Sequence, residues 1–435
     1  MAGTVHIVGA GLAGLSAAVE LSGAGTRVVV HEGAGHAGGR CRSFHDEGLG
    51  CLVDNGNHLL LSGNRAAVAY LERIGARASM HEGPPAFPFC DLRTGARWEI
   101  RPSAGPFPWW ALSPATRAPG TGAMDYLRGL ALAFVGPKFT VAEALGLPKS
   151  APGREMFWDP LTIAVLNAET DEVAAPLLWA VLRETVGQGA RACRPLIARR
   201  GLGPSLIDPA LAFLGMHGAA VRFNARLRAI EFEKGAAKTL RFAEGEVAIG
   251  EGDCVIVALP QGMVGEFLPG IPTPEGTRAI VNAHFRIPGR ESGDRGASFN
   301  DARGDSPAHP RLLGLVGGTA HWVFVRETLA SVTVSAADRL AEEDAATIAG
   351  RVWEDVRRAL DLGPLALPAH RIVKEKRATF AQTPANFARR AKTRTPWPNL
   401  FLAGDWTDTG LPATLEGAIR SGVSAAKAVL GGVVP

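Results

Sequence analysis

The 435-residue sequence lacks several features that mark particular classes of protein. No run of 18 or more uninterrupted apolar residues occurs, which argues against a membrane-spanning helix. There is no long block of basic residues, and a net charge of only +4 gives no indication of a nucleic-acid partner. The five cysteines show no CxxC spacing, so neither a disulfide scaffold nor a metal site is predicted, and a reducing, cytoplasmic compartment is favoured.

What the sequence does contain is typical of a large folded enzyme. Hydrophobic residues make up 46% and charged residues 20% of the chain. This is enough apolar material for a large core and too much for a disordered chain. A chain of this length and composition is consistent with an α/β protein of two lobes.

The first thirty residues follow the pattern of a βαβ unit. Residues 4–8 and 27–31 are β-branched and predict two strands, with a helix over 15–22 between them. Such a unit places its two strands in parallel in one sheet.

Three glycines between the first strand and the helix form the pattern GxGxxG. Gly9 permits a tight turn, Gly11 lets the backbone approach a pyrophosphate, and Gly14 lets helix and strand pack closely. Glu32 follows the second strand, where its carboxylate can accept both hydroxyls of an adenosine ribose. The spacing therefore predicts dinucleotide binding, without yet separating NAD from FAD.

Two further segments favour FAD. Gly38, Gly39 and Arg40 offer a second backbone approach to the pyrophosphate, with a cation beside it. Near the other end of the chain, a predicted strand over 399–403 leads into Gly404 and Asp405, and a helix follows from about 415 to 430. An extended FAD needs this second site for its ribityl chain and ring, whereas a NAD enzyme does not.

The middle of the chain is less regular. Helices are expected within 155–191 and 336–360, and strands at 221–223, 227–232, 239–242 and 254–258.

Three segments carry a resemblance to a known family. Residues 54–64 (DNGNHLLLSGN), 280–285 (IVNAHF) and 403–414 (AGDWTDTGLPAT) resemble the squalene-associated FAD-dependent desaturases, the hydroxysqualene dehydroxylases, within the amine oxidase and carotenoid desaturase superfamily. The resemblance implies an α/β fold with a doubly wound, Rossmann-like FAD-binding domain of residues 1–82, 203–265 and 395–435. A mixed α+β substrate domain of residues 83–202 and 266–394 would be inserted into it.

The resemblance also implies roles for individual residues. The ADP part of FAD would be lined by Gly9, Gly11, Ala13, Gly14, Glu32, Gly38, Gly39 and Arg40, and Leu227 would hold the adenine through its backbone. The flavin end would be approached by Gly56 and Asn57, the pyrophosphate and ribityl region by Gly404 and Asp405, and the pyrimidine end by Thr414 and Leu415. The last cysteine is Cys254, so no thiol precedes the C-terminal motif and FAD is expected to bind non-covalently.

Catalytic candidates are two histidines and an asparagine. Asn282 and His284 share one face of a strand, which could line a cavity or form a solvated sheet face. His58 follows the Gly56–Asn57 turn and is either a satisfied histidine or a neighbour of the flavin. Asp54 could simply cap this turn, and Glu416 lies at a helix start, where a carboxylate is favourable without any catalysis.

The implied reaction is reductive removal of the hydroxyl of hydroxysqualene, a C30 isoprenoid, with electrons from an external donor. The alternatives are a phytoene-type desaturase, which moves hydride in the opposite direction, and a non-enzymatic flavin-containing lipid-binding protein.

A Pro-rich segment gathers six aromatic residues, and two readings of them stay open. They could sit at a membrane-facing mouth, which would make the protein peripheral on the inner face of the bacterial cell membrane, or form the core of the substrate domain. The residues are Phe87, Phe89, Trp98, Phe107, Trp109 and Trp110.

Overall fold

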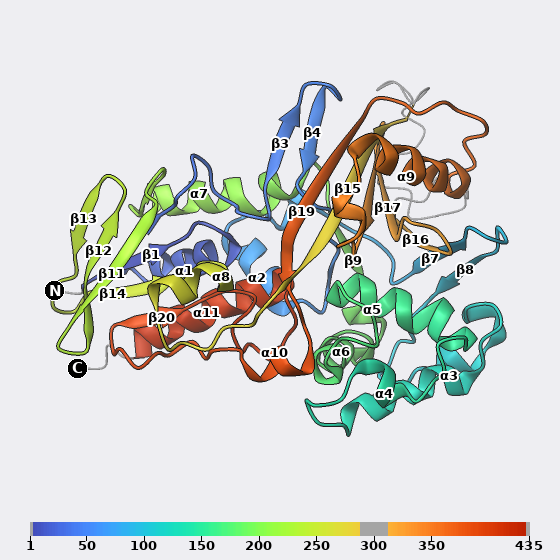
Figure 1. Ribbon diagram of the computed structural model, residues 1–435, viewed down its shortest axis with the longest axis horizontal. Helices are drawn as coiled ribbons and strands as arrows, with labels where there is room; N and C mark the ends of the chain where they lie inside the picture. Colours follow the sequence, from blue (N-terminus) through green and yellow to red (C-terminus); the bar gives the residue numbers. More distant parts are fainter. Residues whose placement is uncertain (1–2, 288–311, 432–435) are drawn as a thin grey trace.

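The computed structural model describes residues 3–287 and 312–431. A five-stranded parallel sheet lies at the centre of one lobe (Figure 1). Numbered along the chain, its strands run in the order 3-2-1-4-5, the doubly wound order of dinucleotide-binding folds. The strands are, in spatial order, β10 (Ala220–Arg222), β2 (Arg27–His31), β1 (Thr4–Val8), β14 (Cys254–Val257) and β20 (Leu400–Leu402). The predicted α/β fold is thus confirmed.

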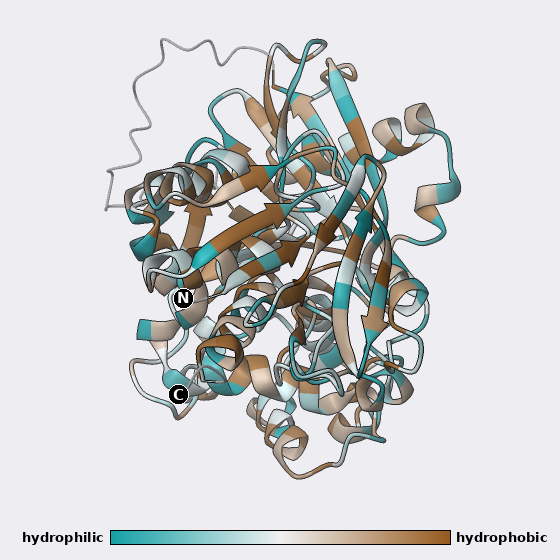
Figure 2. Cartoon of the chain, turned by 90° about the vertical axis from the view of Figure 1, so that its left-hand side faces the viewer, coloured by the Kyte–Doolittle hydropathy of each residue, from teal (hydrophilic) through white to brown (hydrophobic). Residues whose placement is uncertain are grey.

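Helices pack against this sheet and bury its apolar strands. Helix α1 packs against both the last helix of the chain and α7. Figure 2 shows the mostly hydrophobic strands inside the lobe and hydrophilic residues on its outer loops. An antiparallel sheet of β11 (Leu227–Glu233), β12 (Ala236–Phe242) and β13 (Gly245–Ala248) lies at the outer end. The helices are α1 (Leu12–Gly23), α2 (Arg65–Arg73), α7 (Asp208–Met216), α8 (Gln261–Phe267) and α11 (Leu415–Gly431).

A seven-stranded mixed sheet forms the second lobe. Its strands, in spatial order, are β19 (His370–Phe380), β15 (Thr277–Arg286), β18 (Leu329–Val334), β17 (Trp322–Arg326), β16 (Leu312–Val316), β7 (Phe87–Asp91) and β8 (Arg97–Ile100). Only β16 and β7 pair in parallel. The helices of this lobe are α3 (Ala123–Leu127), α4 (Val141–Leu145), α5 (Asp159–Leu166), α6 (Ala175–Glu184), α9 (Ala345–Ala359) and α10 (Pro384–Ala388).

Short strands connect the lobes. A hairpin of β3 (Ser43–Asp46) and β4 (Cys51–Asp54) leads into the region of the predicted flavin turn. A small sheet joins β5 (Leu60–Leu61), β9 (Pro195–Ala198) and β6 (Met80–Glu82). The predicted domain boundaries stay a prediction, and residues 288–311 of the second piece lie outside the described chain. Within the described residues, no helix combines the length and apolarity needed to cross a bilayer.

The stretch over 155–191 contains helices, as predicted. It is divided into a helix that ends at Leu166 and a second one that begins at Ala175. Asn167 takes a left-handed conformation with φ 53°, which ends the first helix. Pro176 lies in the first turn of the second, where its missing N–H costs no hydrogen bond. The stretch over 336–360 likewise contains a helix only from Ala345 to Ala359.

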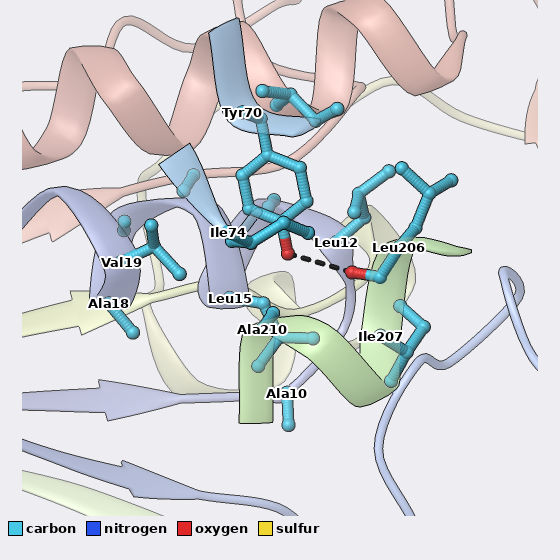
Figure 3. Packing of buried hydrophobic residues seen from close by; sticks show 14 of the residues in the cluster. Ala10, Leu12, Leu15, Ala18, Val19, Tyr70, Ile74, Leu206, Ile207 and Ala210 are labelled. Atoms are coloured by element: carbon cyan, nitrogen blue, oxygen red, sulfur yellow. Dashed lines mark hydrogen bonds between the residues drawn. The ribbon is translucent and has the colours of Figure 1, made fainter. Parts of the chain in front are cut away.

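Tyr70 links three helical segments in the core of the first lobe. Its hydroxyl donates to the carbonyl of Leu206, 2.9 Å away, while its ring packs among apolar side chains of α1 and α7 (Figure 3). A buried phenol needs such a partner. Tyr70 therefore fixes α2 against the segment that leads into α7.

The two ends of the chain meet where α1 crosses α11. A Cβ at Gly422 would lie 2.0 Å from Ser16 Oγ and 2.1 Å from the Ala13 carbonyl oxygen. The Ser16 hydroxyl donates to the Ile419 carbonyl across the same contact, at 3.0 Å. Glycine at 422 thus permits a backbone approach that any side chain would prevent.

We expect Gly422→Ala to lower the free energy of unfolding by about 1–3 kcal/mol, because the added methyl forces the helices apart. The matched control is Gly350→Ala on α9, where a Cβ meets nothing within 4 Å. That control should gain about 0.5–1 kcal/mol from helix propensity. Urea unfolding followed by circular dichroism measures both, and equal effects of the two substitutions would contradict the close helix contact.

Candidate functional site

The three glycines of the first turn are required for different reasons. Gly9 has φ +107°, and a Cβ there would lie 2.6 Å from the Ala258 carbonyl oxygen. At Gly14 a Cβ would lie 1.9 Å from the Gly9 carbonyl oxygen. At Gly11, which has φ −70°, a Cβ would meet nothing within 4 Å. Gly11 alone therefore borders open space, as a turn approached by a ligand requires.

The backbone N–H groups at the start of α1 are not capped by a side chain. Gly11 is the N-cap residue, no side chain caps the helix, and its first turn, which contains Ala13, holds no acidic residue. The first amides of a helix lack partners within the helix and carry partial positive charge. This terminus is suited to a phosphate group.

Glu32 is held at the end of β2 by two backbone bonds. One carboxylate oxygen accepts from the Ala10 N–H at 2.7 Å and the other from the Ala34 N–H at 2.8 Å. A carboxylate can accept about four hydrogen bonds, so acceptor capacity remains for ribose hydroxyls. The Ala225 N–H bonds the Glu32 carbonyl, which brings the start of β11, with Leu227, beside this carboxylate.

The 38–40 loop joins the first turn to the C-terminal motif. The Gly38 N–H donates to the Ala10 carbonyl at 2.9 Å, so the loop lies against the glycine turn. Gly38 and Gly39 have φ 102° and 53°, conformations that glycine adopts without strain. Arg40 pairs with Asp405 at 2.9 Å, and this carboxylate raises the pKa of the guanidinium. The structure thus brings these predicted residues from both ends of the chain together.

Arg390, which sequence reasoning missed, clamps the C-terminal loop. Its guanidinium donates to the carbonyls of Asp405, Trp406 and Thr407. Burial lowers the pKa of Arg390 to about 10, although Asp408 and Asp405 act in the opposite direction. Gly404, with φ 154°, is fixed by its N–H bond to the Ser421 hydroxyl at 2.8 Å.

Thr414 and Leu415 begin α11. The Thr414 hydroxyl accepts from the Gly417 N–H at 3.1 Å, the bond of an N-capping residue. Glu416 has a structural task that its position in the helix did not reveal. Its carboxylate accepts from the N–H groups of Ala66 and Ala67, at 3.0 and 2.8 Å, and so caps α2.

The turn at residues 55–57 is bonded to strand β15. Asn282 donates through Nδ2 to the Asn55 carbonyl at 3.1 Å. Its Oδ1 accepts from the Thr333 hydroxyl at 2.9 Å and from the Asn57 N–H at 3.4 Å. A Cβ at Gly56 would lie 3.3 Å from Asn282 Nδ2. Because Asn282 is 1% exposed, the alternative of a solvated sheet face is wrong for this strand.

His284 is fully engaged by its neighbours. Nε2 lies 3.0 Å from the Asp54 carbonyl oxygen, which can only accept, so this nitrogen carries the proton. Nδ1 then accepts from the Ser331 hydroxyl at 2.9 Å. Burial lowers the pKa of His284 to about 4. The ring is therefore neutral at pH 7 and has no nitrogen free for a ligand.

His58 has the opposite character. It makes no hydrogen bond or ion pair among the described residues, and Nε2 would lie 3.8 Å from a Cβ at Gly56. The ring is half-buried, and desolvation lowers its pKa to about 4. A desolvated ring with unbonded nitrogens, beside the predicted flavin turn, is available to a ligand.

Asp54 ties the hairpin to the second sheet instead of capping the turn. Oδ1 accepts from the Ser43 hydroxyl at 2.5 Å and from the Leu202 N–H at 2.9 Å. Oδ2 lies 2.9 Å from Arg326. Neither Ser43 nor Arg326 carries a local sequence signal, since both meet Asp54 only through the fold.

A row of facing residues crosses the second sheet from this turn. Residues directly opposite each other on paired strands share one face of a sheet. Starting at Asn282, each residue faces the next across the strand pairs: Asn282, Thr333, Trp322, Gly314, Phe89 and Trp98. The row is polar where it meets the turn and aromatic beyond it. At its centre the Phe89 ring covers Gly314, where a Cβ would lie 2.4 Å away.

The six aromatic residues, for which core and mouth were both left open, differ in burial. Phe87, Phe89 and Trp98 are half-buried and pack around buried Trp110. Phe107 and Trp109 are exposed, and their rings contact each other at 4.3 Å.

Two cavities lie in the part of the chain that the structure describes. One, of about 460 Å³, is lined mainly by Arg93, Arg97, Arg357 and Arg358 near the end of α9. The other, of about 590 Å³, lies beside the 36–44 loop and includes Arg42 and Arg371. Neither is lined by a predicted cofactor residue, so the candidate site is defined by the motif geometry and not by cavity size.

Comparisons with known proteins agree with this geometry. The family model of flavin containing amine oxidoreductases matches residues 12–430. The hydroxysqualene dehydroxylase of Zymomonas mobilis is 43% identical over 430 residues, 98% of each chain. That of Rhodopseudomonas palustris is 42% identical over 433 residues, 99% of each chain. Cyclohexylamine oxidase from Brevibacterium oxydans aligns with a TM-score of 0.72 over 99% of both chains, at 15% identity, which supports the fold alone.

Acid should destabilise the protein through its buried histidines. The pKa values of His31, His58, His284 and His321 are each lowered to about 4, with desolvation as the largest cause. In the unfolded chain they bind protons near pH 6.5, so the unfolded state holds more protons between about pH 6.5 and 4. Stability is therefore fully present above pH 6.5 and falls as the pH drops through this window.

We expect the melting temperature to fall between pH 7 and pH 5, and to fall less steeply in His284→Gln, which removes one of these groups. The exposed His217, which directly follows α7, supplies the matched control, His217→Gln. Differential scanning fluorimetry across the pH range measures both. An identical slope in His284→Gln and the parent protein would contradict a neutral, buried His284.

Proposed function

The chain belongs to the flavin containing amine oxidoreductase family, and we propose that it is an FAD-dependent enzyme that reductively removes the hydroxyl of hydroxysqualene to give squalene. The relatives named hydroxysqualene dehydroxylase, similar over nearly the whole chain, support this assignment. The site itself supplies the physical reason.

The observation that carries the proposal is the row across the second sheet. Its polar end, Asn282 and Thr333, lies at the 55–57 turn, and its remainder presents Trp322, Phe89 and Trp98. A surface with one polar end and a long aromatic run fits a hydrocarbon chain that carries a single hydroxyl group. A small, charged amine would leave most of this apolar surface without contacts.

The residues present fit FAD. The α1 N-terminus and the open side of Gly11 would take the pyrophosphate, Glu32 the adenosine ribose, and the paired Arg40 and Asp405 the region between pyrophosphate and ribityl chain. We propose that FAD is bound without a covalent link, between a discontinuous FAD domain and an inserted substrate domain with the boundaries given above. When bound and reduced, FAD supplies a hydride equivalent.

In the substrate, the proposed reaction breaks one bond and forms two. The carbon–oxygen bond breaks, the oxygen takes a proton and leaves as water, and the carbon takes the hydride. We assign His58 as the hydrogen-bonding acid at the leaving oxygen, because its nitrogens are unbonded and it adjoins Gly56. We assign His284 and Asn282 as positioning residues that hold the turn, because their polar atoms already bond its backbone. Electrons come from a donor outside this chain.

Gly11→Ala should leave the apoprotein as stable as the parent and weaken FAD binding at least about ten-fold, because the methyl enters only the space that the pyrophosphate would occupy. Gly14→Ala should instead destabilise the apoprotein, because its Cβ collides with the Gly9 carbonyl. Fluorescence titration with FAD and thermal melting of apoprotein measure the two effects. Unchanged FAD affinity in a folded Gly11→Ala protein would mean that the pyrophosphate lies elsewhere.

The proposed reaction is tested by single turnover. Protein carrying FAD is reduced with dithionite without oxygen and mixed with hydroxysqualene. We expect the flavin to be reoxidised and squalene to appear in equal amount. If the flavin stays reduced and no squalene forms, the dehydroxylase proposal fails. Desaturation of phytoene by the oxidised protein would support the desaturase instead, and lipid binding without either reaction a non-enzymatic carrier.

In the same assay, His58→Gln should lower the rate about 100-fold without changing FAD affinity, since loss of a positioned acid costs about 10²–10⁴-fold. Because desolvation lowers the pKa of His58 to about 4, the parent rate should rise as the pH is lowered from 7 toward this value, and His58→Gln should lack this rise. His45→Gln, an exposed histidine on β3, is the matched control. Full activity of His58→Gln would assign the proton to another donor.

A further inference from the structure

Exposed apolar side chains are concentrated in one short stretch of the chain. Among the described residues, seven large hydrophobic side chains are at least 48% exposed, and six of these lie within residues 109–139. The seventh, Met216, lies on α7 in the other lobe. The six, called here the apolar face, are Trp109, Leu112, Met124, Leu130, Phe134 and Phe139. Single exposed apolar residues are ordinary, but such a concentration marks an interaction surface.

The apolar face is continuous in space. The turn Trp109–Leu112 packs on α3, α3 packs on the turn Arg128–Ala133, and that turn packs on α4. Together these elements form one corner of the molecule, at the lower right of Figure 1. Phe134, at 88%, is the most exposed of the six side chains.

The face also connects to the aromatic row of the candidate site. Trp98, the last residue of the row, packs against the cluster of Trp110 and Tyr126. Trp110 is the neighbour of Trp109 on the apolar face, and Tyr126 lies two residues after Met124. Aromatic contacts thus run from Trp322 through Phe89 and Trp98 to the Trp110 cluster, which adjoins the apolar face along the chain.

The segment that carries the face has a net positive charge. Residues 101–149 contain five basic and two acidic side chains, and so hold +3 of the chain's net +4. Both acids are used at helix starts: Asp125 accepts from the Gly122 N–H and Glu143 from the Thr140 N–H. Lys138 and Lys149 are exposed and form no salt bridge among the described residues. Apolar projections with basic neighbours complement a surface of hydrocarbon and anionic headgroups.

We infer that the apolar face of residues 109–139 docks on an anionic lipid bilayer, from which an isoprenoid reaches the aromatic row. A second copy of the chain is the less suitable occupant, because a two-fold contact would place two copies of the same positively charged segment against each other. The route for the substrate rests on the proposed function. The docking itself does not, since it can be measured without turnover.

The test is co-sedimentation of the FAD-loaded protein with two kinds of vesicle. One contains phosphatidylcholine alone, and the other also contains about 30% of the anionic lipid phosphatidylglycerol. We expect binding to the anionic vesicles and at least about a ten-fold loss of partition in Trp109→Ser/Phe134→Ser, since burial of two aromatic side chains contributes at least this much. Both side chains are exposed, so the variant should fold normally. Met216→Ser is the matched control and should bind as the parent does.

A charge pair of variants separates the electrostatic part. Lys138→Glu/Lys149→Glu should lose binding to anionic vesicles, whereas Lys234→Glu/Lys427→Glu, with the same change of charge in the other lobe, should retain most of it. Absence of parent binding to anionic vesicles, or equal binding by Trp109→Ser/Phe134→Ser, would overturn the inference. So would a parent dimer that this variant converts to a monomer without change in lipid binding. None of these results bears on single turnover with hydroxysqualene.

Discussion

The bonds between strand β15 and the turn at residues 54–57 are the constraint on which the rest of the site depends. Asn282 and His284 each bond a backbone carbonyl of this turn, one at Asn55 and one at Asp54. These bonds fix the turn to the second sheet, while the pairing of β4 with β3 and the bond from the Asn55 N–H to the Arg42 carbonyl hold it to the hairpin. This turn also fixes where His58 and Gly56 lie relative to the aromatic row. A buried polar group is costly unless it is bonded, so each bond here also stabilises the packing of the two lobes.

The chemistry of the site follows from how differently two histidines are satisfied. Both have a pKa near 4 through desolvation, so residue type and titration do not distinguish them. Hydrogen bonding does: His284 uses both nitrogens on Asp54 and Ser331, while His58 uses neither on the described residues. A group that is already saturated can hold a structure but cannot take part in proton transfer without breaking it. The assignment of an acid therefore depends on the unused nitrogen, which only the folded arrangement reveals.

The sequence pattern predicted those helices and strands that depend mainly on neighbouring residues in the chain. The strands over 4–8 and 27–31 have the predicted bounds, and the last helix runs from Leu415 to Gly431, close to its predicted range. Partners that the fold brings together left no such signal in the sequence. Thr333 bonds Asn282 across 51 residues. Nothing in the sequence around Arg390 indicates that this residue binds the C-terminal loop. The split of the helical stretch at Asn167 was missed because an asparagine in a left-handed conformation resembles any other polar helix residue in sequence.

Across the second sheet, the facing residues change from polar to aromatic along one row. Sheet pairing, and not sequence proximity, places Asn282, Trp322 and Phe89 in one line, since they come from strands far apart in the chain. A long hydrocarbon with one reactive polar group faces two opposed demands: apolar contact along its length and hydrogen bonding at one end. A single row that changes from amide and hydroxyl to indole and phenyl meets both with rigid strand residues. The same row gives the site a direction, because its amide end lies at the 55–57 turn and its aromatic end packs against the Trp110 cluster.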